Sequence, residues 1–225
     1  MMYCDLSLTI LQPVIAFYLI QEGAQAVSDA YVKPFADLGP LLNIPTSGTY
    51  LDLAKWTGIS LNDNPCRITG TANPRFPIYL KQYNPKAQAK VYELFKNATT
   101  APGTPFNRAL FMFEGYPMQG VKAVNSQDSA FAYRDDNLLV APLLTYVPNS
   151  GSDVSKKAEA LGNQMRQILY QASGQSTLHT YVNYAYGSEG KSSWYGDDAW
   201  RQIRLRLQKT LYDPWGKFNF YAPIA

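Results

Sequence analysis

The segment from residue 152 to residue 174 constrains the fold more than any other part of the sequence. It reads SDVSKKAEALGNQMRQILYQASG, in which apolar side chains recur at helical spacing and a glycine closes the pattern. A helix with one long apolar stripe needs an apolar surface to cover it, so the chain must also supply a sheet or a second helix. The stripe consists of Val154, Ala158, Leu161, Met165, Ile168 and Ala172.

Short apolar segments elsewhere in the chain are suited to form that surface. Strands are predicted from their composition at 8–20, 76–82, 108–115, 137–147 and 178–184. Further helices are predicted at 22–40, 50–56, 84–97 and 197–211. The segments do not form equal strand–helix repeats. We therefore expect an α+β fold, a largely antiparallel sheet with helices packed on one face.

Three of these elements carry more detailed expectations. Asn84 should cap the helix at 84–97, with Pro85 at its first position. Pro142 costs the strand at 137–147 a hydrogen bond and implies an edge or a bulge there. The helix at 197–211 is predicted to have an inward apolar stripe, Trp200, Ile203, Leu207 and Leu211, and a solvated basic face, Arg201, Arg204, Arg206 and Lys209.

Composition excludes several classes of function. With 20 basic and 17 acidic residues among 225, and no long run of either sign, the chain has little basis for binding nucleic acid. Its single histidine and two cysteines rule out most zinc patterns and a disulfide framework, so no metal site is expected. A single disulfide bond between Cys4 and Cys66 is compatible with these numbers.

The apolar segment 6–20 is the one candidate for a targeting signal. It is too short to span a bilayer, and neither Lys nor Arg precedes it. Asp5 and Pro13 also argue against a signal peptide. We therefore expect a cytoplasmic protein that does not associate with membranes.

Polar aromatic side chains are concentrated in TYVNYAYG, residues 180–187. On a strand, Tyr181 and Asn183 would share one face and offer a phenol and an amide together. A phenol with a lowered pKa can act as a base, although strands favour tyrosine for packing alone. His179 is interpreted as a half-buried structural residue, because no serine lies in a nucleophile-elbow context.

Residues 181–224 as a whole resemble the C-terminal signature of the berberine bridge enzyme-like flavoproteins, FAD-linked oxidoreductases of the vanillyl-alcohol oxidase type. The matching elements are YVNY at 181–184, YG at 195–196, the helix rich in Arg, Leu and Lys, and YDPWGKFNFY at 212–221. Upstream, AFAYRDDNLL at 130–139 is similar to a Phe-Pro-His-Arg segment of that family. FADLGPL and TYLDLAKW also resemble parts of its substrate domain.

The resemblance implies an FAD-dependent oxidoreductase that acts on a small organic substrate in specialised-metabolite biosynthesis. It assigns residues 1–180 to a substrate-binding α+β domain and 181–225 to the family's C-terminal segment, packed on the same domain. The flavin domain of the family is expected to be missing, as in a truncated form. FAD binding would then need a separate FAD-binding chain or a homo-oligomer.

The resemblance also implies site residues. Tyr181 and Glu114 are the catalytic candidates, because the family's Glu or Gln position falls on Pro142 in an ungapped comparison and proline cannot move a proton. The histidine of the Phe-Pro-His-Arg segment is replaced by Tyr133. Substrate contacts are expected from Asn183, Tyr184, Tyr133 and Arg134, and cofactor contacts from Tyr212 and Phe218.

Two other functions fit the same residues. The former substrate pocket could orient a reactive intermediate for cyclisation or isomerisation without a cofactor, because positioning alone can supply much of a rate enhancement. The chain could also be a non-catalytic binding protein or a truncated homologue.

Overall fold

The computed structural model describes residues 2–4, 13–63, 70–148 and 152–224, and Cys66 lies outside them. The chain divides into two compact units. Unit 1 comprises Met1–Ile15 and Thr71–Ala225, and unit 2 comprises Ala16–Gly70. The domain division expected at residue 180 stays a prediction.

Unit 1 is built on an antiparallel sheet with the strand order β2-β1-β4-β5-β3. This confirms the α+β prediction. Residues 16–20 are not part of a strand, so the strand expected at 8–20 was predicted too long at that end, and 8–12 are not described. The strands are β1 (Met2–Cys4), β2 (Pro13–Ile15), β3 (Ile78–Leu80), β4 (Leu110–Gly115) and β5 (Leu138–Leu143).

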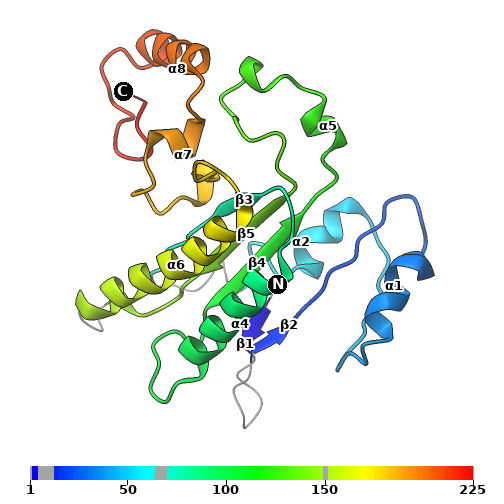
Figure 1. Cartoon of the computed structure of the whole chain (residues 1–225). Coiled ribbons are helices and arrows are strands. Elements are labelled where there is room, and N and C mark those ends of the chain that lie inside the picture. Colours follow the sequence, from blue (N-terminus) through cyan, green and yellow to red (C-terminus); the bar gives the residue numbers. More distant parts are fainter. Residues whose placement is uncertain (1, 5–12, 64–69, 149–151, 225) are drawn as a thin grey trace. The chain divides into compact units, whose positions relative to one another are not determined.

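Two long helices, α4 (Pro85–Thr100) and α6 (Ser152–Ser173), lie side by side over one face of the sheet (Figure 1). The predicted cap of α4 is confirmed, since the Asn84 side chain accepts a hydrogen bond of 3.1 Å from the Ala87 amide. Gly174 follows α6 with φ 71°, a left-handed conformation that suits glycine. The core between helices and sheet includes Phe76, Ile78, Val91, Phe95, Phe111, Val140, Met165 and Leu169.

The packing of α6 depends on one glycine within the helix. Gly162 lies against the ring of Phe76, which has no exposed surface. A Cβ atom at position 162 would overlap that ring. The absence of a side chain therefore permits the close approach of α6 to the sheet.

The opposite face of the sheet carries a different set of side chains, because successive strand residues alternate between faces. Phe111 and Phe113 of β4 belong to the core, so Met112 and Glu114 point to the other side. The same alternation places Tyr79 of β3 on that side. We call this side the tyrosine face.

Pro142 does not lie on the tyrosine face. It pairs with Phe111, whose side chain is in the core beneath the helices, so Pro142 lies on the helix side of the sheet, and its correspondence to the family's Glu or Gln position stays a prediction. The expected edge or bulge is wrong, because β5 lies between β4 and β3 and its register runs through Pro142 without an extra residue. On the side of β3, the pairing of β5 is continuous from Leu138 to Val140. It is then interrupted at Pro142 and resumes as an isolated bridge between Leu143 and Arg75.

The strand predicted at 178–184 is not formed. Residues Val182–Tyr184 adopt a short 3₁₀ helix, η4, and the helices α7 (Lys191–Tyr195) and α8 (Ala199–Tyr212) follow. The earlier loops contain α5 (Gln119–Lys122) and η2 (Ser126–Asp128). Tyrosine and valine favour strands, but the local turn determines this segment.

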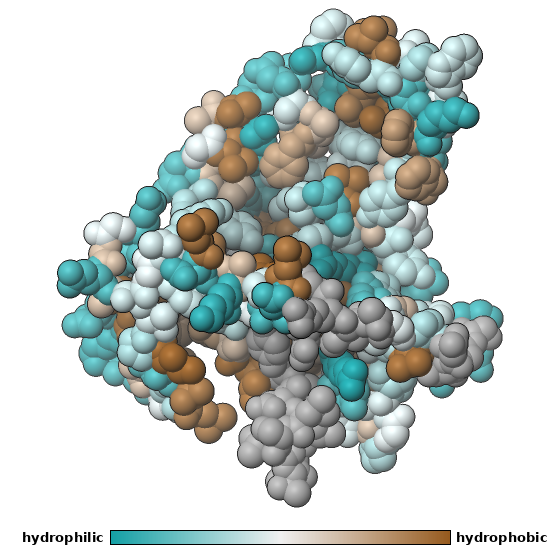
Figure 2. All heavy atoms as spheres, turned by 180° about the vertical axis from the view of Figure 1, so that it is seen from behind, coloured by the Kyte–Doolittle hydropathy of each residue, from teal (hydrophilic) through white to brown (hydrophobic). Residues whose placement is uncertain are grey.

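Helix α8 is present as predicted, but its inward face was predicted wrongly. Arg201 is only 5% exposed, and its guanidinium donates to the Ser126 carbonyl at 2.7 Å and to the Tyr195 carbonyl at 3.2 Å. The apolar stripe points outward, with exposed fractions of 58% for Trp200, 45% for Ile203, 62% for Leu207 and 66% for Leu211. Figure 2 shows hydrophobic side chains at the end of unit 1 that carries α8.

Unit 2 contains α1 (Asp29–Ala36), η1 (Tyr50–Asp52) and α2 (Leu53–Trp56), which confirms helices within the predicted ranges 22–40 and 50–56. The Asp52 carboxylate accepts from the Thr49 amide at 2.8 Å and fixes the start of η1. Every described side chain of this unit is half-buried or exposed.

In the described ranges, no helix is both long and apolar enough to cross a membrane.

Candidate functional site

Glu114 is the carboxylate of the tyrosine face. It lies on β4 opposite Leu139 of β5, which fixes its place at one end of the sheet. The Tyr116 hydroxyl, two residues further on, donates to it at 2.6 Å. A half-buried carboxylate with a phenol as partner can accept a proton or orient a hydroxyl group of a ligand.

The rest of the site comes from η4, from Tyr181 just before it, and from Tyr79 of β3. Tyr181 precedes η4 and Tyr184 ends it, and their ring centroids are 5.1 Å apart, because residues three apart in a 3₁₀ helix lie one above the other. The Asn183 amide donates to the Tyr181 hydroxyl at 2.9 Å. The ring of Tyr79 on β3 meets that of Tyr181 edge-on at 5.9 Å. We call these residues with Glu114 and Tyr116 the tyrosine cluster.

Tyr181 and Asn183 are close together, but not for the reason that predicted it. Alternation along a strand was expected to place them on one face. They are adjacent because η4 turns and the amide bonds the phenol. The hypothesis that they serve together in a site stays a prediction.

The electrostatics of the cluster keep several phenols protonated. Burial raises the pKa of Tyr184, and Glu114 raises it further, whereas the guanidinium of Arg75 opposes this. The pKa of Tyr116 is raised by burial and by its hydrogen bond to Glu114. Burial also raises the pKa of Tyr79. These three tyrosines are therefore hydrogen-bonding groups at neutral pH rather than bases.

Replacing Glu114 with glutamine should shift the ionisation of Tyr116 and Tyr184 to lower pH, because the carboxylate that opposes phenolate formation is removed. The measurement is phenolate absorbance during an alkaline titration. The raised pKa values also mean that stability should fall above about pH 10, where unfolded tyrosines ionise first.

The exposed Glu93 on α4 provides a matched control, since Glu93→Gln removes the same charge from the helix side of the sheet. Its titration should follow that of the unaltered chain. Identical curves for Glu114→Gln and the unaltered chain would contradict the arrangement described above.

Tyr133 and Arg134 make contacts within the chain next to the cluster. Tyr133 is 7% exposed, and its hydroxyl donates to the Ser192 carbonyl at 2.6 Å. Arg134 donates to the Val121 carbonyl at 3.1 Å and to the Ser129 hydroxyl at 2.8 Å. These contacts order the segment that adjoins the tyrosine face, and their roles toward a substrate stay predictions.

His179 is paired in a way that suits the structural interpretation. Its Nδ1 lies 2.8 Å from the carboxylate of Asp136, and its ring stacks on Tyr133 with centroids 4.1 Å apart. The Gln175 amide lies 3.2 Å from the same nitrogen. The backbone carbonyl of His179 accepts from the Tyr79 amide, which joins this segment to β3.

Tyr212 and Phe218 lie on the exposed surface beside α8, with exposed fractions of 77% and 72%. The Asp213 carboxylate accepts from the Phe218 amide at 3.0 Å and shapes the turn between them. Further along, the Tyr221 hydroxyl donates to the Val182 carbonyl at 2.7 Å, which connects the tail to η4. The cofactor contacts expected from Tyr212 and Phe218 stay predictions.

Three residues of the site were missed in the sequence. Arg75, Tyr79 and Tyr116 all adjoin the tyrosine cluster. Arg75 and Tyr79 could have been found, because they alternate with the core residues Phe76 and Ile78. Tyr116 lies past the end of β4, where the periodic signal stops.

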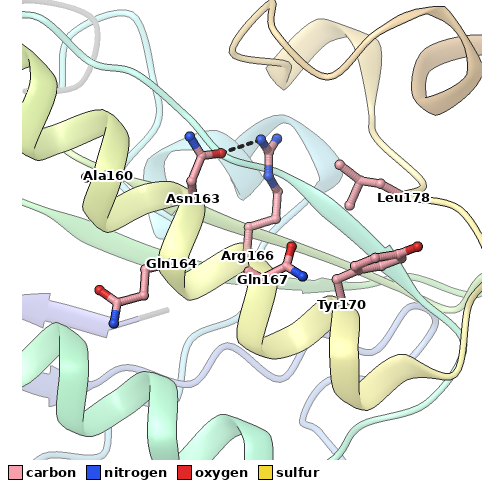
Figure 3. Close-up of a pocket in the computed structure, with 7 residues that line it drawn as sticks. All are labelled: Ala160, Asn163, Gln164, Arg166, Gln167, Tyr170 and Leu178. Atoms are coloured by element: carbon pink, nitrogen blue, oxygen red, sulfur yellow. Dashed lines mark hydrogen bonds between the residues drawn. The ribbon is translucent and has the colours of Figure 1, made fainter.

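A separate cavity of about 490 Å³ lies along α6 and contains none of the predicted site residues. Figure 3 shows that its lining comes from α6 and from Leu178 just after that helix, with the Arg166 guanidinium bonded to Asn163. In the described residues, no group of three or more His, Cys, Asp or Glu is arranged to hold a metal ion.

Comparisons with known proteins identify relatives of the chain. It is 50% identical over 213 residues to the FAD-linked oxidoreductase chyH of Penicillium rubens, which covers 95% of this chain and 42% of that protein. It is 48% identical over 213 residues to the FAD-linked oxidoreductase chry5 of Gibberella zeae, with the same coverage. The chain therefore spans about two fifths of the length of these curated relatives. No model of a protein family matches.

Solved structures share the fold at low sequence identity. The berberine bridge enzyme from Eschscholzia californica matches with a TM-score of 0.59 and 16% identity, over 87% of this chain and 42% of that one. A glycopeptide hexose oxidase in complex with teicoplanin matches with a TM-score of 0.61 and 19% identity, over 88% and 39%. The fold expected from the resemblance is thereby confirmed.

Proposed function

Because the chain is 50% identical to an FAD-linked oxidoreductase over 95% of its length, we propose that it forms the substrate-binding part of such an enzyme. The substrate would be a small organic molecule of specialised metabolism, oxidised over the tyrosine face. The observation that carries the proposal is the convergence of two segments, β4 with Glu114 and the η4 segment with Tyr181 and Tyr184, on one side of the sheet.

Within this function, the protein groups bind the substrate and move its proton. Glu114 is proposed to accept the proton of the reacting hydroxyl, with Tyr116 as its hydrogen-bond partner. The Tyr181 hydroxyl, which accepts from Asn183, is left to donate its own hydrogen to the substrate. Tyr184 and Tyr79 would form the aromatic wall.

The described residues fit part of a flavin site. An aromatic wall with a carboxylate suits the substrate side of a flat ring, while the sequence contains no glycine-rich phosphate-binding loop. Bound FAD would accept a hydride from the substrate. The proposed cofactor contacts of this chain are Tyr212 and Phe218, and a separate FAD-binding chain or a homo-oligomer would supply the rest.

The outer surface of α8 supports association with such a partner. Large apolar side chains stand in a row along the helix, and three of them, Trp200, Leu207 and Leu211, are more than half exposed. Contiguous apolar surface of this kind is typical of an interaction site. A partner chain or a second copy would cover it.

The test is the absorbance spectrum of the purified chain, alone and after incubation with FAD, followed by gel filtration. We expect a flavin band that survives gel filtration and elutes with an assembly larger than the monomer. Leu207→Lys places a charge in the apolar stripe and should lower both the assembly and the retained flavin.

Gln208→Lys is the matched control, because it adds the same charge at an exposed polar position of α8. A folded, monomeric and colourless chain would contradict flavin binding by this chain. It would then favour a missing FAD-binding partner or cofactor-free cyclisation on the tyrosine face.

A further inference from the structure

Arg75 is a cation at the edge of the tyrosine cluster that the proposed function does not use. It forms an isolated bridge with Leu143 of β5, and it directly precedes the core residue Phe76. Alternation therefore directs its side chain to the tyrosine face. The guanidinium carbon lies 4.2 Å from the ring centroid of Tyr184.

The guanidinium has no carboxylate partner in the described part of the chain. The ion pairs found there, those of Lys33, Arg166, His179 and Lys209, all involve other residues. Arg75 is half-buried, so a share of its hydration is lost without a compensating charge. An anion bound against it would supply that charge.

The register separates Arg75 from the proton-accepting end of the site. Arg75 lies opposite Leu143, whereas Glu114 lies opposite Leu139, so their backbones are about 14 Å apart along β5. The Arg75 guanidinium lies over the ring of Tyr184, and Glu114 is also close enough to raise the pKa of that tyrosine, so both charges adjoin Tyr184. A ligand over Tyr184 can thus have one end near Arg75 and the other near Glu114.

We propose that Arg75 selects a substrate that carries a carboxylate on an aromatic body. This inference rests on the proposed function of the tyrosine face. A planar guanidinium binds a carboxylate through two parallel hydrogen bonds. The rings of Tyr79, Tyr181 and Tyr184 provide edges and faces against which an aromatic ring packs. The carboxylate end would then leave the reacting end beside Glu114.

The experiment compares benzoate with benzamide, a neutral probe of nearly the same shape, by calorimetric titration of the whole chain. Benzoate should bind about ten times more tightly than benzamide, the preference that a hydrogen-bonded charge pair gives. Arg75→Met should abolish the preference, so that benzoate and benzamide bind the variant equally. Arg75→Lys should retain part of it, since lysine keeps the charge without the two-pronged geometry.

Lys90→Met is the charge-matched control, because Lys90 is exposed on α4 on the other side of the sheet. It should keep the full preference. Circular dichroism checks that the Arg75 variants fold. Equal affinities for the two probes, no binding of either, or a preference that survives Arg75→Met would overturn the inference.

The outcomes separate this inference from the proposed function. An Arg75-dependent preference in a chain that retains no flavin would support the anion site and weaken the oxidoreductase proposal. A chain that retains flavin but binds both probes equally would do the reverse.

Discussion

Replacing Glu189 with glutamine should lower the free energy of unfolding by about 3–5 kcal/mol, the cost of breaking a buried ion pair from one side. The Glu189 side chain is fully buried and lies 2.5 Å from the guanidinium of Arg166, which is 8% exposed. Its two oxygens also accept from the backbone amides of Tyr186 and Gly187 at 2.8 Å. Glutamine keeps the shape but leaves the Arg166 charge without a counter-ion.

The comparison variant is Glu93→Gln, an exposed carboxylate on α4, which should change stability little. Denaturant unfolding followed by circular dichroism measures both variants. Arg166→Met combined with Glu189→Gln removes both charges, keeps an amide oxygen as acceptor at position 189, and should cost less than Glu189→Gln alone. A loss below about 1 kcal/mol for Glu189→Gln would show that the pair contributes no more than a surface salt bridge.

The ion pair between Arg166 and Glu189 also makes the stability of the chain depend on pH. Burial alone would raise the pKa of Glu189, but the two backbone amides and the guanidinium outweigh it and hold the pKa below its ordinary value. The stabilisation is therefore complete above the ordinary carboxylate pKa of about 4.3 and is lost as the pH falls through the lower folded value. Glu189→Gln should lack this component of acid sensitivity.

Substituting Gly162 with alanine should destabilise the chain by about 1–3 kcal/mol, although alanine favours helices. The added methyl group would overlap the ring of Phe76, which is fully buried. Either the ring or α6 must move. Thermal or denaturant unfolding measures the loss.

Gly120→Ala should change the stability in the opposite direction. Gly120 lies in α5, and no atom lies within 4 Å of a Cβ added there. Alanine should stabilise that short helix slightly, by up to about 1 kcal/mol. Equal effects of the two substitutions would mean that overlap with Phe76 does not determine the cost at Gly162.

The elements predicted well are those that local signals define. Helix α4 has its cap at Asn84 and Pro85 at its start, and α6 has an apolar stripe that ends at a glycine. The strands β4 and β5 are short apolar runs bounded by turn residues. Such signals depend on neighbours in sequence, so the sequence alone is enough to find them.

The elements predicted badly depend on contacts between distant segments. Helix α8 is amphipathic, but the periodicity of its side chains does not show which face packs against the rest of the chain. Arg201 decides this, because loop carbonyls at Ser126 and Tyr195 require its donors. Likewise, η4 replaces a predicted strand because hydrogen bonds from Tyr221, 37 residues beyond Tyr184, hold the turn.

The site was predictable in part. Tyr181, Asn183, Tyr184 and Glu114 were named from the sequence, and the structure brings them together. The cation that opposes Glu114 was not found, since Arg75 lies in a segment without motif or charge cluster. Its alternation with the core residue Phe76 was the one signal in the sequence, and the bridge to Leu143 and the contact with Tyr184 show that it lies on the same face.

Because its apolar face points outward, α8 should detach from unit 1 differently from the helices that cover the core. The helix is attached to its own unit by directed hydrogen bonds from Arg201 and Arg204, while its apolar side is already in water. Both the heat-capacity change and the denaturant dependence of an opening scale with the apolar area that it exposes. Arg201 is the buried residue of α8, so in a chain without a partner we expect detachment of this helix to expose little new apolar area and to depend on polar contacts rather than on the core.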